Sequence, residues 1–285
     1  MATIECRSAQ RGVAPKMVQL DGITDREVTK ARAALDALIE SEEQVSDAVA
    51  AGFVAVAVMC PKANPSDLWQ HVIYRHLLDS GWSDNRWKRV SGFALERAFV
   101  SMYESRLAPH NLRMRKLDKT EANKILVGLG TNIRDTKIDV FLEGKAPNTA
   151  GPWRVFGAAH VKSSIAERIQ DDVPASQAFM SAGLVSIALT MDSKSYPPPH
   201  GECINWGELG GRSLGVDKER LKRGYVEVEG QFDGLFSFNL RTPPSPATTA
   251  SGKRIYTMGL SEKQPDQLVK FLTEKWIAYA KANPV

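Results

Sequence analysis

Two apolar stretches that each carry one charged residue decide the fold of this chain: Ile138-Asp139-Val140-Phe141 and Ala159-His160-Val161-Lys162. Both are short apolar runs of the kind that forms buried strands. A charged side chain within such a run is costly unless it is paired or binds a metal ion. We therefore predict two neighbouring buried strands that bring together Asp139 and Lys162, which have 22 residues between them in the sequence.

The regions around these stretches differ in their hydrophobic pattern. Before residue 110, apolar residues recur at helical spacing, and Thr24 and Glu27 have the form of a capping box. Helices are predicted at residues 24–59, 65–81 and 91–107. Alternating apolar and basic residues then predict an exposed edge strand at residues 112–117. Strands are also predicted at residues 125–129, 138–142, 155–161, 184–189, 232–238 and 254–260. Further helices are expected to begin within residues 164–169 and to close the chain at 266–280.

The order of these elements predicts one α/β domain, with a mixed α+β sheet at its core, over residues 1–285. We divide it into an N-terminal helical region at residues 1–80 and a sheet-containing core at residues 81–285. A chain of 285 residues is long enough to bury a large core, and we find no internal repeat or long linker.

The composition is that of an ordinary globular protein, with 43% hydrophobic and 25% charged residues and a net charge of +4. This charge weakly favours a polyanionic partner. Cys6, Cys60 and Cys203 are odd in number and lack the spacing of a zinc site, so we expect reduced cysteines in a cytoplasmic protein. The apolar run at 49–59 is shorter than the roughly 20 residues that span a bilayer, and no signal pattern is present, so no membrane partner is expected.

The pair formed by Asp139 and Lys162 suits the hydrolysis of a phosphodiester. Asp139 would bind a divalent cation such as Mg²⁺, the carbonyl of Val161 would face the same ion, and Lys162 would stabilise the attacking hydroxide or the pentacovalent phosphate. Spacing alone leaves a second interpretation open, in which Asp139 and Lys162 form a structural ion pair. His160 is open to two roles as well, as a structural donor or as a ligand.

Lys162 is followed by Ser163-Ser164-Ile165-Ala166-Glu167-Arg168. This arrangement resembles the PD-(D/E)XK nucleases and, within them, the type II restriction endonucleases that cut CCGG-containing sites. In that family a strand Asp and a strand Lys form the catalytic pair, and the following helix carries an acidic residue and an Arg that read C and G. Glu167 and Arg168 match this pair. Arg binds guanine O6 and N7, and Glu accepts from cytosine N4, each contact giving about 1–3 kcal/mol of discrimination.

The sequence departs from the family pattern at several positions. Ile138 replaces the usual proline, and His160 stands where the motif has an acid. Ala166 replaces an additional Arg of several relatives, and Ala175 a downstream Glu of others. In this group a Glu on an upstream helix faces the metal site, and Glu96 fits that description. Asp171 and Asp172 are the fallback candidates.

Further blocks of sequence are similar to those of family members that cut ACCGGT, and the similarity covers roughly residues 50–260. They are residues 60–61, 64–69, 197–201, 205–210 and 239–244. The resemblance implies that Arg89 contacts DNA. Ser163 and Ser164 would contact phosphate or cap the helix, and the two roles are equally open.

The resemblance implies a Mg²⁺-dependent type II restriction endonuclease of the prokaryotic cytoplasm. It would cut double-stranded DNA at a palindrome containing CCGG, such as ACCGGT, and leave four-base 5′ overhangs, with Glu96, Asp139 and Lys162 as catalytic residues. A palindrome calls for a homodimer on DNA. A cognate DNA methyltransferase would act on the same site without binding the enzyme. Two alternatives are a catalytically silent DNA-binding protein on the same fold and a repair nuclease without a fixed site.

Overall fold

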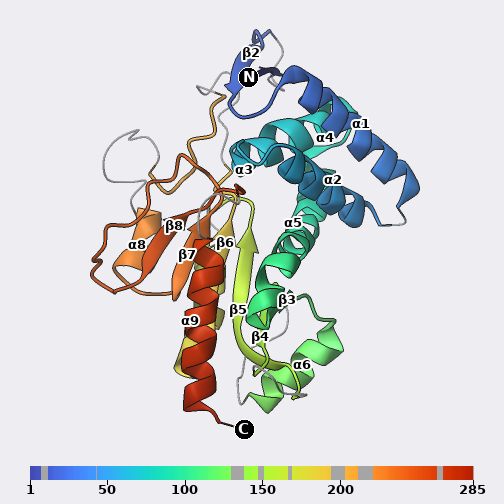
Figure 1. Ribbon diagram of the computed structural model, residues 1–285. Helices are drawn as coiled ribbons and strands as arrows, with labels where there is room; N and C mark the ends of the chain where they lie inside the picture. The colour runs from blue at the N-terminus through green and yellow to red at the C-terminus, as the bar shows by residue number, and fades with distance from the viewer. Residues whose placement is uncertain are drawn as a thin grey trace.

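A mixed sheet forms the centre of the molecule (Figure 1). The computed structural model describes residues 1–7, 12–42, 44–129, 138–146, 151–165, 169–193, 203–210, 221–261 and 266–284. In these residues the sheet has six strands, in the order β3 (Leu112–Arg115), β4 (Val140–Gly144), β5 (Arg154–Lys162), β6 (Val185–Thr190), β7 (Gly234–Ser237) and β8 (Arg254–Thr257). β3, β4 and β5 are antiparallel neighbours, whereas β5 to β8 run parallel. The beginning of β4 therefore lies at the same edge of the sheet as the carboxyl ends of β5 to β8.

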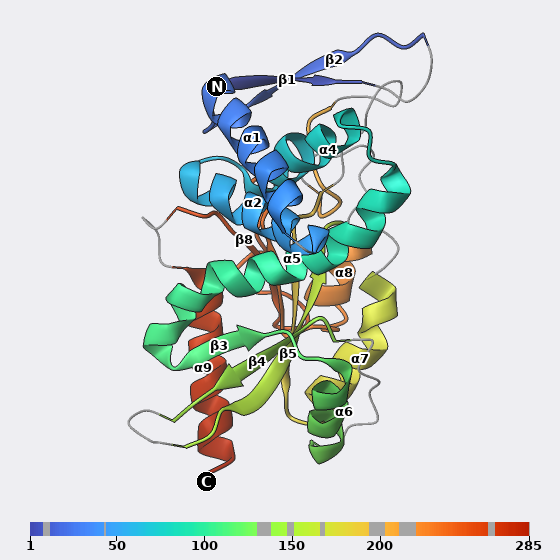
Figure 2. The ribbon, with the colours of Figure 1, turned by 90° about the vertical axis from the view of Figure 1, so that its right-hand side faces the viewer.

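Helices cover both faces of this sheet. They are α5 (Asp84–Leu107), α6 (Lys119–Gly128), α7 (Ile169–Ser181), α8 (Leu221–Glu227) and α9 (Gln267–Ala282). Leu142 and Phe156 belong to a buried cluster that includes residues of α5 and α9. Phe141 and Ala158, which point the other way, pack with residues of α6 and α7. Figure 2 shows the strands between α9 on one side and α7 on the other.

The N-terminal part is mainly helical. Its elements are β1 (Ala2–Cys6), β2 (Lys16–Leu20), α1 (Asp25–Ser41), α2 (Val45–Met59), α3 (Pro65–Asp67), the π-helix η1 (Leu68–Tyr74) and α4 (Arg75–Asp79); the 3-10 turn η2 (Ala108–His110) follows α5. The predicted capping box is confirmed, because Thr24 and Glu27 bond reciprocally at the start of α1.

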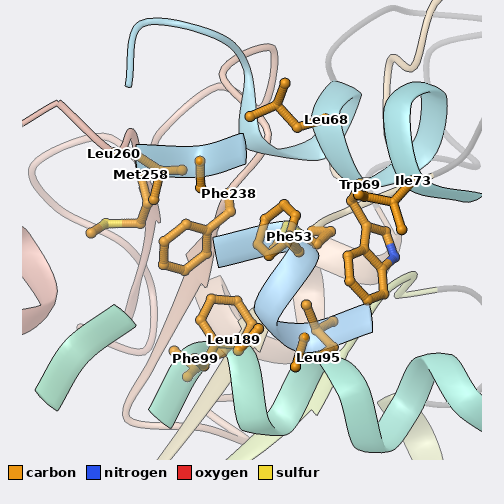
Figure 3. Packing of buried hydrophobic residues seen from close by; sticks show 14 of the residues in the cluster. Phe53, Leu68, Trp69, Ile73, Leu95, Phe99, Leu189, Phe238, Met258 and Leu260 are labelled. Atoms are coloured by element: carbon orange, nitrogen blue, oxygen red, sulfur yellow. The ribbon is translucent and has the colours of Figure 1, made fainter. Parts of the chain in front are cut away.

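One hydrophobic cluster connects this part with the sheet (Figure 3). The rings of Phe53 on α2 and Trp69 on η1 meet edge to face, with centroids 5.2 Å apart. Phe99 on α5 lies 4.7 Å from Phe238, which follows β7. Because burial of such aromatic side chains is a large stabilising term, the helical region is held on the sheet by packing. The boundary at residue 80 stays a prediction.

Several element predictions were wrong. Residues 125–129 are not a strand; most of them belong to α6, which Asp118 caps and which buries Ala122 and Leu126 on one face. A short apolar run does not distinguish a strand from a helix turn, and the cap was the missed signal. The predicted helix at 24–59 is two helices, the helix at 91–107 begins at Asp84, and the hairpin of β1 and β2 was not predicted.

Cys6, Cys60 and Cys203 are unpaired and buried. Among the described residues, every helix is too short or too polar to cross a bilayer.

Candidate active site

Asp139 and Lys162 meet at the edge of the sheet where β4 begins and β5 ends. Because these strands are antiparallel, with Val140 opposite Ala159, the residue before β4 faces the last residues of β5. Lys162 Nζ lies 3.0 Å from Asp139 Oδ2, and the backbone N–H of Val161 donates to the same oxygen at 2.7 Å. The structure thus brings the two predicted residues into direct contact.

A second carboxylate approaches Lys162 from α7. Asp172 Oδ2 lies 3.0 Å from Lys162 Nζ, so the ammonium sits between two acidic side chains. Burial acts to lower the pKa of Lys162, but Asp139 and Asp172 outweigh it, and the pKa is raised above its ordinary value. Lys162 is therefore a cation at neutral pH. Asp172 was only a fallback candidate in the sequence, because its position depends on how α7 packs on β5.

Glu96 lies on α5, with its side chain buried as predicted. Its carboxylate is ion-paired with Lys116, which follows β3. Burial raises the pKa of Glu96 and the charge of Asp139 adds to this, while Lys116 and Lys162 oppose it. Glu96 is thus within electrostatic reach of Asp139 and Lys162. Lys116 was missed, because its alternating basic and apolar surroundings indicate an exposed edge strand.

Among the described residues, His160 has no partner for either of the roles left open by the sequence. Its ring is fully buried, edge-on to Phe232 at 5.6 Å, and neither ring nitrogen has a hydrogen-bond partner among the described residues. Burial lowers the pKa of His160, which keeps the ring neutral. His160 contributes packing on the α7 side of β5.

The structure describes three of the five predicted DNA contacts. Arg89 is exposed on α5, seven residues before Glu96 and hence on the same helix face, about 10 Å along the axis. Ser163 accepts a hydrogen bond at its carbonyl from the N–H of Ser193 at 2.8 Å. The hydroxyl of Ser164 donates to a glutamate, described below. Residues 166–168, which include Glu167 and Arg168, lie outside the described residues.

The carboxylates fit a magnesium ion. In the described part of the chain, no group of three or more His, Cys, Asp or Glu side chains is arranged to hold a metal. Mg²⁺ uses one or two carboxylates and keeps several waters, so Asp139 with one other acid suffices. Oxygen donors next to a protonated lysine are also the chemistry that phosphoryl transfer uses.

Comparisons with known proteins agree with this geometry. No family model matches the chain. It is 40% identical over 265 residues to the type II restriction enzyme AgeI of Thalassovita gelatinovora, which covers 90% of this chain and 93% of that protein. A crystal structure of specific restriction endonuclease AgeI with DNA matches with a TM-score of 0.85 and 37% identity, over 96% of this chain and 99% of that one. A pre-specific BsaWI–DNA complex matches at a TM-score of 0.43 and 16% identity, too low to support an argument.

These matches confirm the mixed α/β fold and the enzyme class that the sequence predicted. The identity extends over nine-tenths of both chains, which places the active-site strands and the helices around them within the shared region. The protein belongs to the type II restriction endonucleases, the site-specific deoxyribonucleases.

Proposed function

We propose that this endonuclease hydrolyses double-stranded DNA at a palindrome that contains CCGG, with ACCGGT or a related hexamer as its site. Cleavage follows the first base of the hexamer, requires Mg²⁺ and leaves four-base 5′ overhangs. The observation that carries the proposal is the placement of Lys162, whose Nζ lies 3.0 Å from Oδ2 of Asp139 and 3.0 Å from Oδ2 of Asp172. The solved relative is a DNA complex, which supports duplex DNA as the substrate.

Asp139 and Val161 are the proposed metal-binding groups on the sheet. In a strand, the N–H and C=O of one residue point to the same side. The N–H of Val161 donates to Asp139, so its carbonyl faces the Asp139 side as well. Glu96 is the proposed second carboxylate, since it shares the electrostatic environment of Asp139. A bound Mg²⁺ would neutralise phosphate charge and lower the pKa of a coordinated water.

Lys162 is the proposed catalytic cation. Its amine is protonated at neutral pH and donates hydrogen bonds, so it stabilises the negative charge that grows on the pentacovalent phosphate. Asp172 touches Lys162 and holds it in orientation. Asp172 is therefore a positioning residue in this proposal, and Glu96 keeps the role of metal ligand.

Glu167 and Arg168 are proposed to read the C·G pairs, and Arg89, Ser163 and Ser164 to contact the DNA near the pocket. A palindrome presents the same half-site twice, so two chains related by a twofold axis are needed to cut both strands. We propose a homodimer on DNA. A methyltransferase of the same specificity would protect the host site without touching this protein.

Digestion of plasmid DNA tests the proposal. With Mg²⁺, a plasmid that contains ACCGGT and other CCGG hexamers should yield discrete fragments, and a chelator should prevent this. The matched control is the same plasmid with every CCGG removed by synonymous changes. Supercoiled plasmid left intact would indicate a silent DNA-binding protein, and a smear would indicate a nuclease without a fixed site.

A further inference from the structure

A network of buried polar groups lies at the carboxyl ends of β5, β6 and β7, next to the candidate active site. At its centre is Asp192, which follows β6, is fully buried and has a left-handed φ of 43°. Its carboxylate accepts hydrogen bonds from the N–H groups of Glu208 and Leu209, at 2.7 and 3.3 Å, and from the hydroxyl of Thr242 at 2.9 Å. Asp192 therefore fixes the backbone of residues 208–209 relative to the sheet.

Gly207 shows how closely this backbone approaches Asp192. Its φ is 72°, and a Cβ added there would overlap the carboxylate of Asp192. A side chain at this position would thus both strain the backbone and displace the acceptor. The close approach is what allows one carboxylate to bond two successive N–H groups.

Glu208 extends the network to the residues that follow Lys162. Only 4% of the Glu208 side chain is exposed. Its carboxylate accepts hydrogen bonds from the hydroxyl of Ser164 at 3.0 Å and from Lys222 Nζ at 2.7 Å. The neighbouring Ser163 is held at its carbonyl by the N–H of Ser193, the residue after Asp192. Both residues that follow Lys162 are thus tied to one buried network.

We propose that Asp192 and Glu208 are positioning residues for sequence recognition: they fix Ser163-Ser164, the segment that connects Lys162 in the sequence to the residues proposed to read CCGG. Neither residue needs to touch DNA. The proposal rests on the proposed function. Hydrogen bonds to base edges demand accurate placement, so loosening the segment should weaken discrimination between sites. The cleavage rate at the CCGG site should fall less, because Lys162 is held by its own contacts to Asp139 and Asp172.

The test is the ratio of single-turnover cleavage rates on two duplexes, one with CCGG and one with an inner base pair changed. Glu208→Ala should lower this ratio about tenfold or more, the scale of one hydrogen bond to a charged group. Glu208→Gln retains an acceptor for Ser164 and should restore most of the ratio. The matched control is Glu143→Ala, because Glu143 is also buried and paired with basic side chains, Arg113 and Arg115, at the far end of β4. It should lower the melting temperature and leave the ratio unchanged.

A double-mutant cycle shows whether Glu208 acts through Ser164. Ser164→Ala and Glu208→Ala should each lower the ratio, and the double variant should lower it no further. If Glu208→Ala does not fold, Ser164→Ala alone tests whether this contact supports discrimination between sites. The inference is overturned when Glu208→Ala or Ser164→Ala keeps the wild-type ratio, whatever its effect on binding to all duplexes. Wild-type enzyme that cuts without site preference would instead overturn the proposed function.

Discussion

In the proposed mechanism, Lys162 is the residue on which catalysis depends most directly. Its half-buried amine lies between two carboxylates and stays protonated, so it can stabilise charge on the phosphate. Lys162→Met should slow single-turnover cleavage by about 10²–10³-fold, the loss typical of one preorganised donor to a transition state. Gel-shift binding to the CCGG duplex should remain within a few-fold of wild type. A variant that cuts at the wild-type rate would remove Lys162 from the active site.

Asp172 makes a separate prediction about pH. Together with Asp139 it raises the pKa of Lys162, against the opposing effect of burial. In Asp172→Asn one of these carboxylates is neutral, so the pKa of Lys162 falls and the amine loses its proton at a lower pH. The alkaline limb of the cleavage pH–rate profile should therefore shift to lower pH. Equal profiles for Asp172→Asn and wild type, followed up to the highest pH at which the duplex stays paired, would show that Asp172 does not act on Lys162.

A buried histidine in the π-helix η1 should make the free energy of unfolding depend on pH. His71 within it is fully buried, and its Nδ1 accepts from Nε of Arg75 at 3.0 Å. Burial, with Arg75 and Arg241 adding to it, lowers the pKa of His71 from 6.5 to about 3. Since this folded-state pKa is lower than the unfolded one, the neutral ring contributes stability above about pH 6.5 that is lost as the pH falls towards 3.

The measurement is the free energy of unfolding in urea at pH 7, 6, 5 and 4. Each such histidine contributes a slope of up to about 1.4 kcal/mol per pH unit in this window. His71→Asn should be less stable at pH 7 but show a shallower loss towards pH 4. Equal slopes for the two proteins would mean that His71 binds a proton in the folded state.

At the level of elements, the sequence predicted what local chemistry determines. β4 and β5 were predictable because each is an apolar run with one costly charge at its end, and the pairing of Asp139 with Lys162 followed from that cost. The contacts of Asp172 and Lys116 were not predictable, since they depend on how α7 and β3 are placed against β5 and α5. The helix α6 was mistaken for a strand because the cap at Asp118 was missed and a short apolar run does not distinguish the two.

For the whole molecule, the proposed palindromic site predicts that a second copy of the chain binds the same DNA. Light scattering of the enzyme with a short duplex that contains one CCGG hexamer, in Ca²⁺ to prevent cutting, should give two chains per duplex. The same mixture with a duplex that lacks CCGG is the control and should not form this species. A single chain on the specific duplex would contradict the twofold arrangement.

Sequencing the ends of a digest tests the central claim most directly, because the ends record both the site and the bond that is cut. Genomic DNA of known sequence, digested with wild-type enzyme and Mg²⁺, should give fragments whose 5′ overhangs all read CCGG within one hexamer, and Asp139→Ala should give no such ends. Ends that share no sequence, or CCGG ends from Asp139→Ala at the wild-type rate, would contradict site-specific hydrolysis at the site of Asp139 and Lys162.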